Sequence, residues 1–130
     1  MLLADAEAPS WGRVRTGYQV RASARYPDGR WVQLGSEAFT TPRLTMRWLR
    51  GRVGDVADQL DPPDARPLRA WLNDDTEQER ALRGLARGER YALRAKDDAG
   101  VVYVLAAWPV AVDLNSLALL LMKGTAWPTR

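Results

Sequence analysis

The sequence predicts a single α+β domain built from two β-hairpins and about four short helices. Alternating apolar and polar residues indicate the hairpins, at about residues 17–40 and 89–112, and the chain between them follows helical spacing. The chain has 130 residues, of which 46% are hydrophobic and 27% are charged, which is typical of one globular domain. We therefore expect residues 1–130 to share one core.

The first hairpin is marked by its turn. Residues 17–26 alternate strictly, which predicts a strand with one buried face. Pro27-Asp28-Gly29 then supplies a restricted backbone, a side-chain acceptor and a flexible glycine, as a tight turn requires. The extended, β-rich run over residues 30–40 completes the hairpin.

The helical region begins at Thr41-Pro42, which predicts an N-cap followed by the first helical position. Because Gly51 and Gly54 weaken the middle of the following segment, we expect two helical pieces, the second ending at the prolines of residues 61–64. That proline-rich turn is also the predicted junction between two lobes. Residues 68–72 predict a short helical turn, and residues 76–79 have the capping-box pattern of a further helix.

The second hairpin resembles the first in its opening residues. Residues 18–22 and 91–95 both follow the pattern Tyr-x-[Val/Leu]-Arg-Ala, so we consider a ββα unit present twice. Residues 101–112 are nearly all apolar, which is typical of a central strand covered on both faces. Residues 114–122 then predict a helix with hardly any polar face.

The composition excludes most catalytic chemistry. The chain contains no Cys and no His, which rules out disulfides, thiolate or imidazole metal sites and histidine-based triads. The acidic residues at 74–79 and 97–98 stand where helix N-termini and turns favour them, and no glycine-rich phosphate loop occurs. We therefore expect no enzyme activity, no catalytic residue, no metal site and no cofactor.

Charge is distributed in blocks. Residues 11–54 carry nine Arg against two acids, residues 55–79 carry eight acids against two Arg, and residues 80–96 carry six basic residues against one acid. The net charge is only +3. A GC-rich genome would also produce an excess of arginine, so a genomic and a functional origin both stay open.

The first basic block predicts a surface that binds nucleic acid, because guanidinium groups pair with phosphates and aromatic rings stack on bases. Trp31 and Trp48 lie among its arginines. The candidate binding residues are Arg21, Arg25, Arg30, Arg43, Arg47 and Arg50. We expect these arginines to form one face shared by the first hairpin and the first helix.

Part of this block resembles a known DNA-binding domain. Residues 18–49 loosely resemble the arm-type domain of phage and mobile-element tyrosine integrases, with Pro27-Asp28-Gly29-Arg30 between two strands and a helix that carries Trp48-Leu49. The resemblance implies a sheet that enters the major groove of DNA, and an accessory protein of a phage or mobile element. The second strand is longer here and carries Glu37, and no recombinase domain accompanies it.

A second interpretation is an oligomeric phage structural or assembly component. A nearly all-apolar helix in so small a domain favours a partner surface, and alternating charge blocks suit neighbouring copies. The candidate interface residues are Leu117, Leu120, Leu121 and Trp127. Two further interpretations stay open: an immunity or inhibitor protein, and a small enzyme that uses only Asp, Lys or Tyr.

The partners follow from these alternatives. We expect either nucleic acid or a protein partner, including further copies of the chain, and no membrane, because no stretch approaches the roughly 18 apolar residues of a span. The predicted location is the cytoplasm, or the interior of a virion for a phage component.

Overall fold

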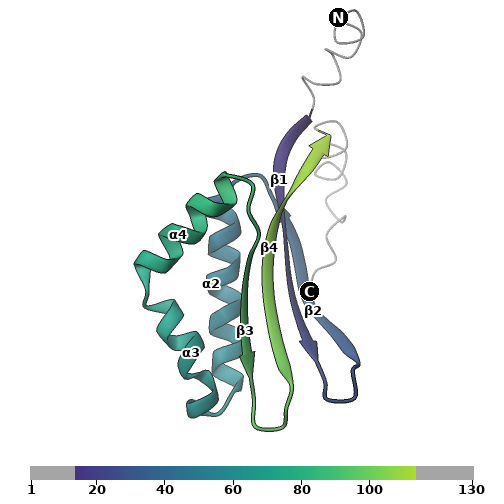
Figure 1. The fold of residues 1–130 in the computed structure, drawn as a ribbon, viewed down its shortest axis with the longest axis vertical. Helices are drawn as coiled ribbons and strands as arrows, with labels where there is room; N and C mark the ends of the chain where they lie inside the picture. Colours follow the sequence, from purple (N-terminus) through teal and green to yellow (C-terminus); the bar gives the residue numbers. More distant parts are fainter. Residues whose placement is uncertain (1–13, 114–130) are drawn as a thin grey trace, which may run out of the picture.

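The computed structural model describes residues 14–113, which form a four-stranded antiparallel sheet with three helices on one of its faces (Figure 1). The elements are, in order, β1 (Val14–Arg25), β2 (Trp31–Phe39), α2 (Pro42–Gln59), α3 (Pro62–Leu72), α4 (Asp75–Ala86), β3 (Tyr91–Lys96) and β4 (Val102–Asp113). The strand order β2-β1-β4-β3 makes β1 and β4 central. The predicted α+β class and both hairpins are confirmed.

The two hairpins join through their longer strands. β1 pairs with β4 along its whole length, from Val14 opposite Asp113 to Arg25 opposite Val102. The predicted turn between β1 and β2 is confirmed, with the Arg30 amide donating to the Asp28 carboxylate at 2.9 Å and Gly29 at a φ of 91°. Few side chains adopt that positive φ without strain, so the turn needs its glycine.

Helix α2 corrects the expectation of two separate pieces. It runs unbroken from Pro42 to Gln59, and the Thr41 hydroxyl caps it by accepting from the Leu44 amide at 3.2 Å. Each helical glycine costs only about 1 kcal/mol relative to alanine. Burial of Leu49 and Val53 against the sheet offsets that cost, so Gly51 and Gly54 do not end the helix.

The other two helices begin earlier than expected. Helix α3 starts at Pro62 and not at residue 68, because proline fits the first turn, where its missing N–H has no helical partner to lose. Helix α4 is capped by Asp74, whose carboxylate accepts from the Glu77 amide at 3.1 Å, rather than by Thr76. Residues 61–64 thus open a helix.

The order of elements corrects the idea of a repeated ββα unit. Three consecutive helices separate the hairpins within residues 14–113, so one ββ pair is followed by three helices rather than one. The fourth predicted helix, over residues 114–122, lies outside the described residues.

The buried side chains form one cluster between the sheet and the helices. Val20 of β1, Leu49 of α2, Leu68 of α3, Leu85 of α4 and Leu105 of β4 are each at most 1% exposed. The cluster therefore takes side chains from both sides of residues 61–64.

Strand β4 is central in the sheet, but only one of its faces packs against the helices. Leu105 and Ala107 are buried there, whereas the alternate residues Val104, Ala106 and Trp108 remain half-buried. Within residues 14–113, the three helices cover only the first of these faces.

Candidate functional site

The face of the sheet that points away from the helices is the candidate site, and we call it the open sheet face. Side chains of directly paired residues in a sheet project to the same side. Val20, Ala22 and Ala24 of β1 are buried under the helices, so the alternate residues of β1 and their partners face outward. These residues include Arg21, Ser23 and Arg25 of β1, Trp31 and Gln33 of β2, Arg94 and Lys96 of β3, and Val102, Val104, Ala106 and Trp108 of β4.

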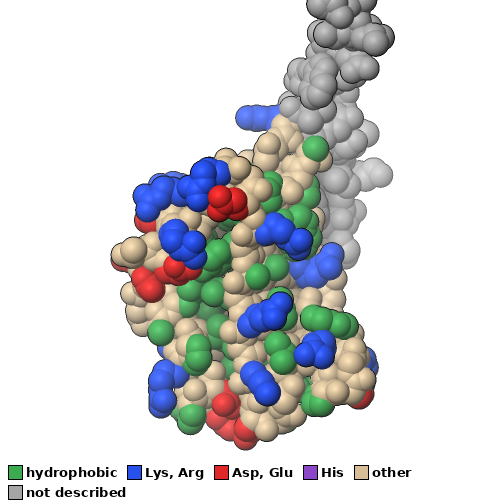
Figure 2. Space-filling model, in the orientation of Figure 1, with side chains coloured by type: hydrophobic (Ala, Val, Ile, Leu, Met, Phe, Trp, Pro, Cys, Tyr) green, Lys and Arg blue, Asp and Glu red, His purple; other side chains and the backbone are tan. Residues whose placement is uncertain are grey.

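Five exposed cations surround the part of this face between Trp31 and Trp108, and exposed Arg15 occupies a further outward position of β1, beyond Trp108 and opposite Val112. Arg21 and Arg25 lie on β1, Arg94 and Lys96 lie on β3, and Arg90 immediately precedes β3. No Asp or Glu occupies an outward position on the described strand residues of β1 to β3, and Glu37 pairs with Val20 and so belongs to the helix side. Figure 2 shows Lys and Arg side chains spaced over the sheet with hydrophobic ones between them, while acidic groups gather over the helices and at the lower edge.

These cations lack the acidic partners found elsewhere on the molecule. The ion pairs within residues 14–113 are Arg52 with Asp55, Arg69 with Asp58, Arg80 with Glu77, and Arg87 with Glu89. All of them lie on the helices or on the connection from α4 to β3. The positive charge of the open sheet face is thus not neutralised by these pairs and is available to an anionic ligand.

Two tryptophans flank a hollow of about 510 Å³ on the open sheet face. Trp31, at the start of β2, is 56% exposed, and Trp108 lies across the sheet on β4. The guanidinium carbons of Arg21 and Arg90 lie 5.4 and 5.7 Å from the centre of the Trp108 ring. At such distances a cation is attracted to the aromatic face. The hollow therefore combines aromatic surface and positive charge.

The six arginines predicted from the sequence do not share one surface. Arg21 and Arg25 belong to the open sheet face, and Arg30 lies in the adjacent turn with its guanidinium 4.5 Å from the Tyr26 ring centre. The other three, Arg43, Arg47 and Arg50, lie on α2, on the opposite side of the sheet. The predicted continuous hairpin and helix face is therefore divided by the sheet itself.

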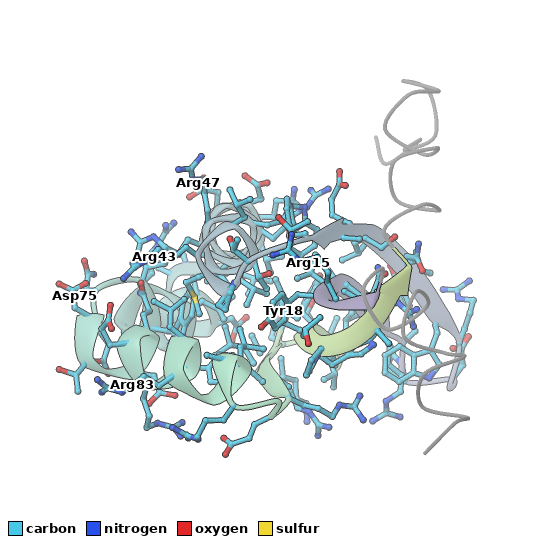
Figure 3. All side chains as sticks on the ribbon, turned by 90° about the horizontal axis from the view of Figure 1, so that it is seen from above. Arg15, Tyr18, Arg43, Arg47, Asp75 and Arg83 are labelled. Atoms are coloured by element: carbon cyan, nitrogen blue, oxygen red, sulfur yellow. The ribbon has the colours of Figure 1, made fainter. Side chains whose placement is uncertain are left out.

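The arginines of α2 line a groove of mixed charge. Arg43, Arg47 and Arg50 face Asp75 and Glu79 of α4 across a hollow of about 540 Å³. Figure 3 shows Arg43 and Arg47 on the outer side of α2, with Asp75 on the neighbouring helix. Arg50 also donates a hydrogen bond to Gln78. Carboxylates beside these arginines repel phosphate, so this groove suits a polyanion less well than the open sheet face does.

Sequence reasoning missed Arg90, Arg94, Lys96 and Trp108 as site residues. The alternation of residues 90–96 placed the three cations on one face, and that signal was present in the sequence. Their neighbours were not predictable, because only the long-range pairing of β1 with β4 brings Arg21 beside Trp108.

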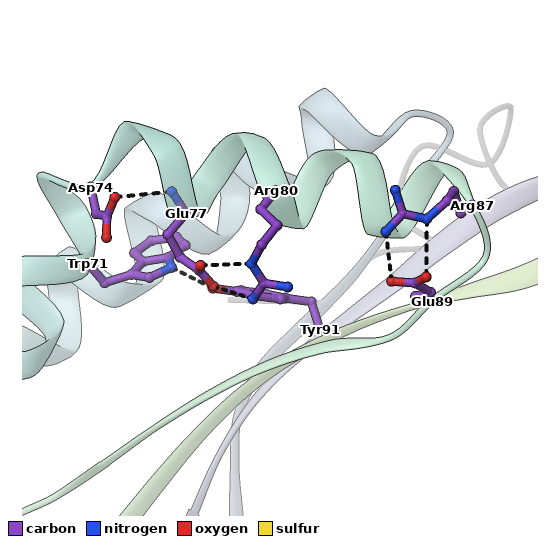
Figure 4. A network of polar contacts seen from close by, with 7 residues as sticks. All are labelled: Trp71, Asp74, Glu77, Arg80, Arg87, Glu89 and Tyr91. Atoms are coloured by element: carbon purple, nitrogen blue, oxygen red, sulfur yellow. Dashed lines mark hydrogen bonds and ion pairs between the residues drawn. The ribbon is translucent and has the colours of Figure 1, made fainter.

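A partly buried polar network holds the start of β3 against the helices (Figure 4). The Tyr91 hydroxyl accepts from the Trp71 indole N–H at 2.7 Å and donates to the Glu77 carboxylate at 2.8 Å. Arg80 donates two further hydrogen bonds to that carboxylate, at 2.9 and 2.7 Å. The network fixes Tyr91 on the helix side, so the preceding Arg90 is held at the edge of the open sheet face.

The same network shifts two protonation equilibria. Burial, assisted by the hydrogen bond to Glu77, raises the pKa of Tyr91 to about 12. The hydrogen bonds from Arg80 and then from Tyr91 lower the pKa of Glu77 below its ordinary value. Both shifts favour the hydrogen-bonded state seen in the structure, a neutral phenol beside a charged carboxylate.

A cluster of three acidic residues near the start of α3 is a weaker candidate for a binding site. Carboxylate oxygens of Asp61, Asp64 and Asp98 lie within 4.8 Å of one another, but Asp64 already accepts from the Asp98 amide at 3.2 Å, and both Asp61 and Asp64 stand at a helix start, where acids are common. The candidate interface residues Leu117, Leu120, Leu121 and Trp127 lie outside the described residues. Among residues 14–113, no helix is long and apolar enough to cross a membrane.

Comparison of the chain with models of protein families, with curated proteins and with solved structures finds no match. The geometry and charge of the open sheet face are therefore the basis for assigning a function.

Proposed function

We propose that this protein is a non-enzymatic binding protein that engages nucleic acid through its open sheet face. The observation that carries the proposal is the set of five exposed cations around an apolar, tryptophan-bearing strand, without an acidic side chain at the outward positions of β1 to β3. A polyanion gains most from such a surface, because each neutralised phosphate releases condensed counterions.

The aromatic groups favour nucleic acid over a simple polyanion. Trp31 offers exposed ring surface on which a base can stack, whereas Arg21 and Arg90 lie over the Trp108 ring. A base reaches the Trp108 ring when these two guanidinium groups turn toward phosphates of the same ligand. The resemblance of residues 18–49 to the integrase arm-type domain supports nucleic acid as the partner and a role as an accessory protein of a phage or mobile element. The major-groove insertion that the resemblance implies does not fit the four-stranded sheet, so only the class of partner is taken from it.

The test compares two triple variants that remove the same charge. The first variant, Arg21→Ala/Arg94→Ala/Lys96→Ala, removes three cations from the open sheet face. The second, Arg43→Ala/Arg47→Ala/Arg83→Ala, removes three exposed arginines from the helical layer. We expect the first variant to bind a labelled mixed-sequence oligonucleotide at least about 10-fold more weakly at low salt. Its slope of log affinity against log salt should fall by about 2, at roughly 0.7 to 0.9 for each lost phosphate contact.

The helical-layer variant controls for net charge and should retain most of the affinity and the salt slope. Fluorescence anisotropy at several salt concentrations measures both quantities, and light scattering checks that the mass of each variant is unchanged. Equal losses in the two variants, or a larger loss in the second, would place the contacts elsewhere. An oligomer indifferent to nucleic acid would favour the assembly interpretation instead.

A further inference from the structure

We infer that the ligand of the open sheet face is a single strand of DNA or RNA, with unstacked bases lying against Trp108 and Trp31. This inference rests on the proposed function and adds to it the structural state of the nucleic acid. Three features of the open sheet face support it: the width of the sheet, the hollow between the tryptophans, and the position of the cations.

The width of the sheet opposes insertion into a duplex. Neighbouring strands lie about 4.8 Å apart, so the axes of four strands span about 14 Å before any side chains are added. The major groove of DNA is only about 12 Å wide and admits a helix or a two-stranded ribbon. Trp108 lies on the central strand β4, between β1 and β3, and not on a projecting ribbon. A duplex resting on this sheet would keep its stacked bases away from Trp108.

The hollow between the tryptophans suits an unstacked base. Its volume of about 510 Å³ is comparable to that of small-ligand sites, which occupy roughly 300 to 1,000 Å³. Val104 and Ala106 line it from β4, and Ser23 and Gln33 add polar groups that can bond base edges. Paired bases inside a duplex expose neither their rings nor their pairing edges to such a hollow.

The cations lie on both sides of the apolar strand. Arg94 and Lys96 of β3 pair with Val104 and Val102 of β4, and Arg21 and Arg25 of β1 pair with Ala106 and Val102 on the other side. The apolar row of β4 is thus bordered by positive charge along both of its neighbours. This arrangement lets phosphates of a flexible single strand reach cations while its bases cover the apolar centre.

The experiment compares three probes of equal length and mixed sequence: a single-stranded DNA, a single-stranded RNA and a duplex DNA. We expect the full chain to bind at least one single strand 10-fold or more tightly than the duplex at moderate salt. Binding should also quench tryptophan fluorescence, because bases stack on indole rings. The DNA and RNA probes distinguish the two sources of the strand, and preference for either supports the inference.

Variants of the tryptophans separate stacking from charge. Trp108→Ala should weaken single-strand binding about 10-fold and leave duplex binding within about 2-fold, since loss of one stacked base costs that order of affinity. Trp108→Phe keeps a ring and should restore most of the binding. Trp31→Ala changes a side chain that is 56% exposed, so it tests the other wall of the hollow with little risk to folding.

The outcomes distinguish this inference from the proposed function. Equal affinity for duplex and single strand, or equal loss of both in Trp108→Ala, overturns the single-strand inference while nucleic-acid binding stands. Single-strand binding unchanged in both Trp108→Ala and Trp31→Ala also overturns it. Absence of binding to all three probes overturns the proposed function as well.

Discussion

Two groups of basic side chains on this protein differ in what surrounds them. Arg80 and Arg87 form close ion pairs with Glu77 and Glu89 on the helical side. Arg21 and Arg90 instead lie over the Trp108 ring. Surface ion pairs and exposed cation–π contacts each add at most about 1 kcal/mol to stability, so neither group is needed mainly for folding. The second group is the one whose charge a ligand can use.

The raised pKa of Tyr91 makes the stability of the protein depend on pH in the alkaline range. Its pKa is raised to about 12 from an ordinary value near 10, so the folded protein keeps the phenol proton over a pH range in which the unfolded chain loses it. This contribution to stability is fully present below about pH 10 and is lost as the pH rises through 12. We expect the urea midpoint to fall over this range more steeply in the wild type than in Tyr91→Phe.

The phenylalanine variant should also be less stable at neutral pH. Removing the hydroxyl leaves the indole N–H of the buried Trp71 without its acceptor, which costs about 1 to 3 kcal/mol. Tyr26→Phe, in the turn between β1 and β2, controls for the loss of one tyrosine hydroxyl. Identical alkaline slopes for Tyr91→Phe and the wild type would contradict the assignment.

At the scale of the elements, α2 shows how packing overrides local preference. Its 18 residues include Gly51 and Gly54, yet the apolar stripe of Leu49, Val53 and Val56 is buried along its length. A Cβ atom placed on Gly51 would meet nothing within 4 Å, whereas one on Gly84 of α4 would lie 2.9 Å from a carboxylate oxygen of Glu89. Position 51 therefore has room for an alanine side chain, whereas position 84 has room only if Glu89 moves.

We therefore expect substitution by alanine to change the free energy of unfolding differently at the two positions. Gly51→Ala should raise the free energy of unfolding by about 0.5 to 1 kcal/mol, because alanine restricts the unfolded chain and favours the helix. Gly84→Ala should gain less or lose stability, since Glu89 must move and weaken its pair with Arg87. Chemical denaturation of both variants measures the effect. A destabilised Gly51→Ala variant would refute the argument.

On the scale of the whole molecule, one buried cluster joins both hairpins and all three described helices. The pairing of β1 with β4 connects residues that lie far apart in the sequence, so neither hairpin has its full set of neighbours alone. A molecule organised in this way unfolds as a unit, because loss of one hairpin exposes the shared core.

We therefore predict a single cooperative unfolding transition. Tryptophan fluorescence and far-UV circular dichroism should give coincident unfolding curves in urea. Leu105→Ala should lower the free energy of unfolding by about 2 to 5 kcal/mol and move both curves together to lower urea concentration. Leu105 is 1% exposed at the centre of the cluster. Two separate transitions would instead support independent lobes that meet near residues 61–64.

Much of the local structure was predictable because local chemistry decides it. Strict alternation in residues 17–26 and the sequence Pro27-Asp28-Gly29 predicted the first hairpin, and Thr41-Pro42 predicted the start of α2. Predictions of helix boundaries were wrong where they depended on the weak helical preferences of single glycine or proline residues. Gly51 and Gly54 were expected to divide the helix, and Pro62 was expected to end one rather than begin one.

The candidate site was only partly predictable for the same reason. Arg21 and Arg25 were identified from their alternation along β1, but the sequence grouped them with Arg43 and Arg47, which the sheet separates from them. Residues that are near along the chain are also near in space within a strand or a helix. They can lie far apart when they belong to the two sides of a sheet.

The sequence by itself determined the class of the fold, the two hairpins and which side chains alternate on each strand, because backbone geometry and side-chain period are local properties. Only the tertiary structure decided that β1 lies beside β4, with all three described helices on one side. That arrangement brings Arg21, Arg90 and Trp108 together and leaves the apolar row of β4 half-buried within residues 14–113. Strand order depends on burying one shared core, and a shared core is a property of the whole chain.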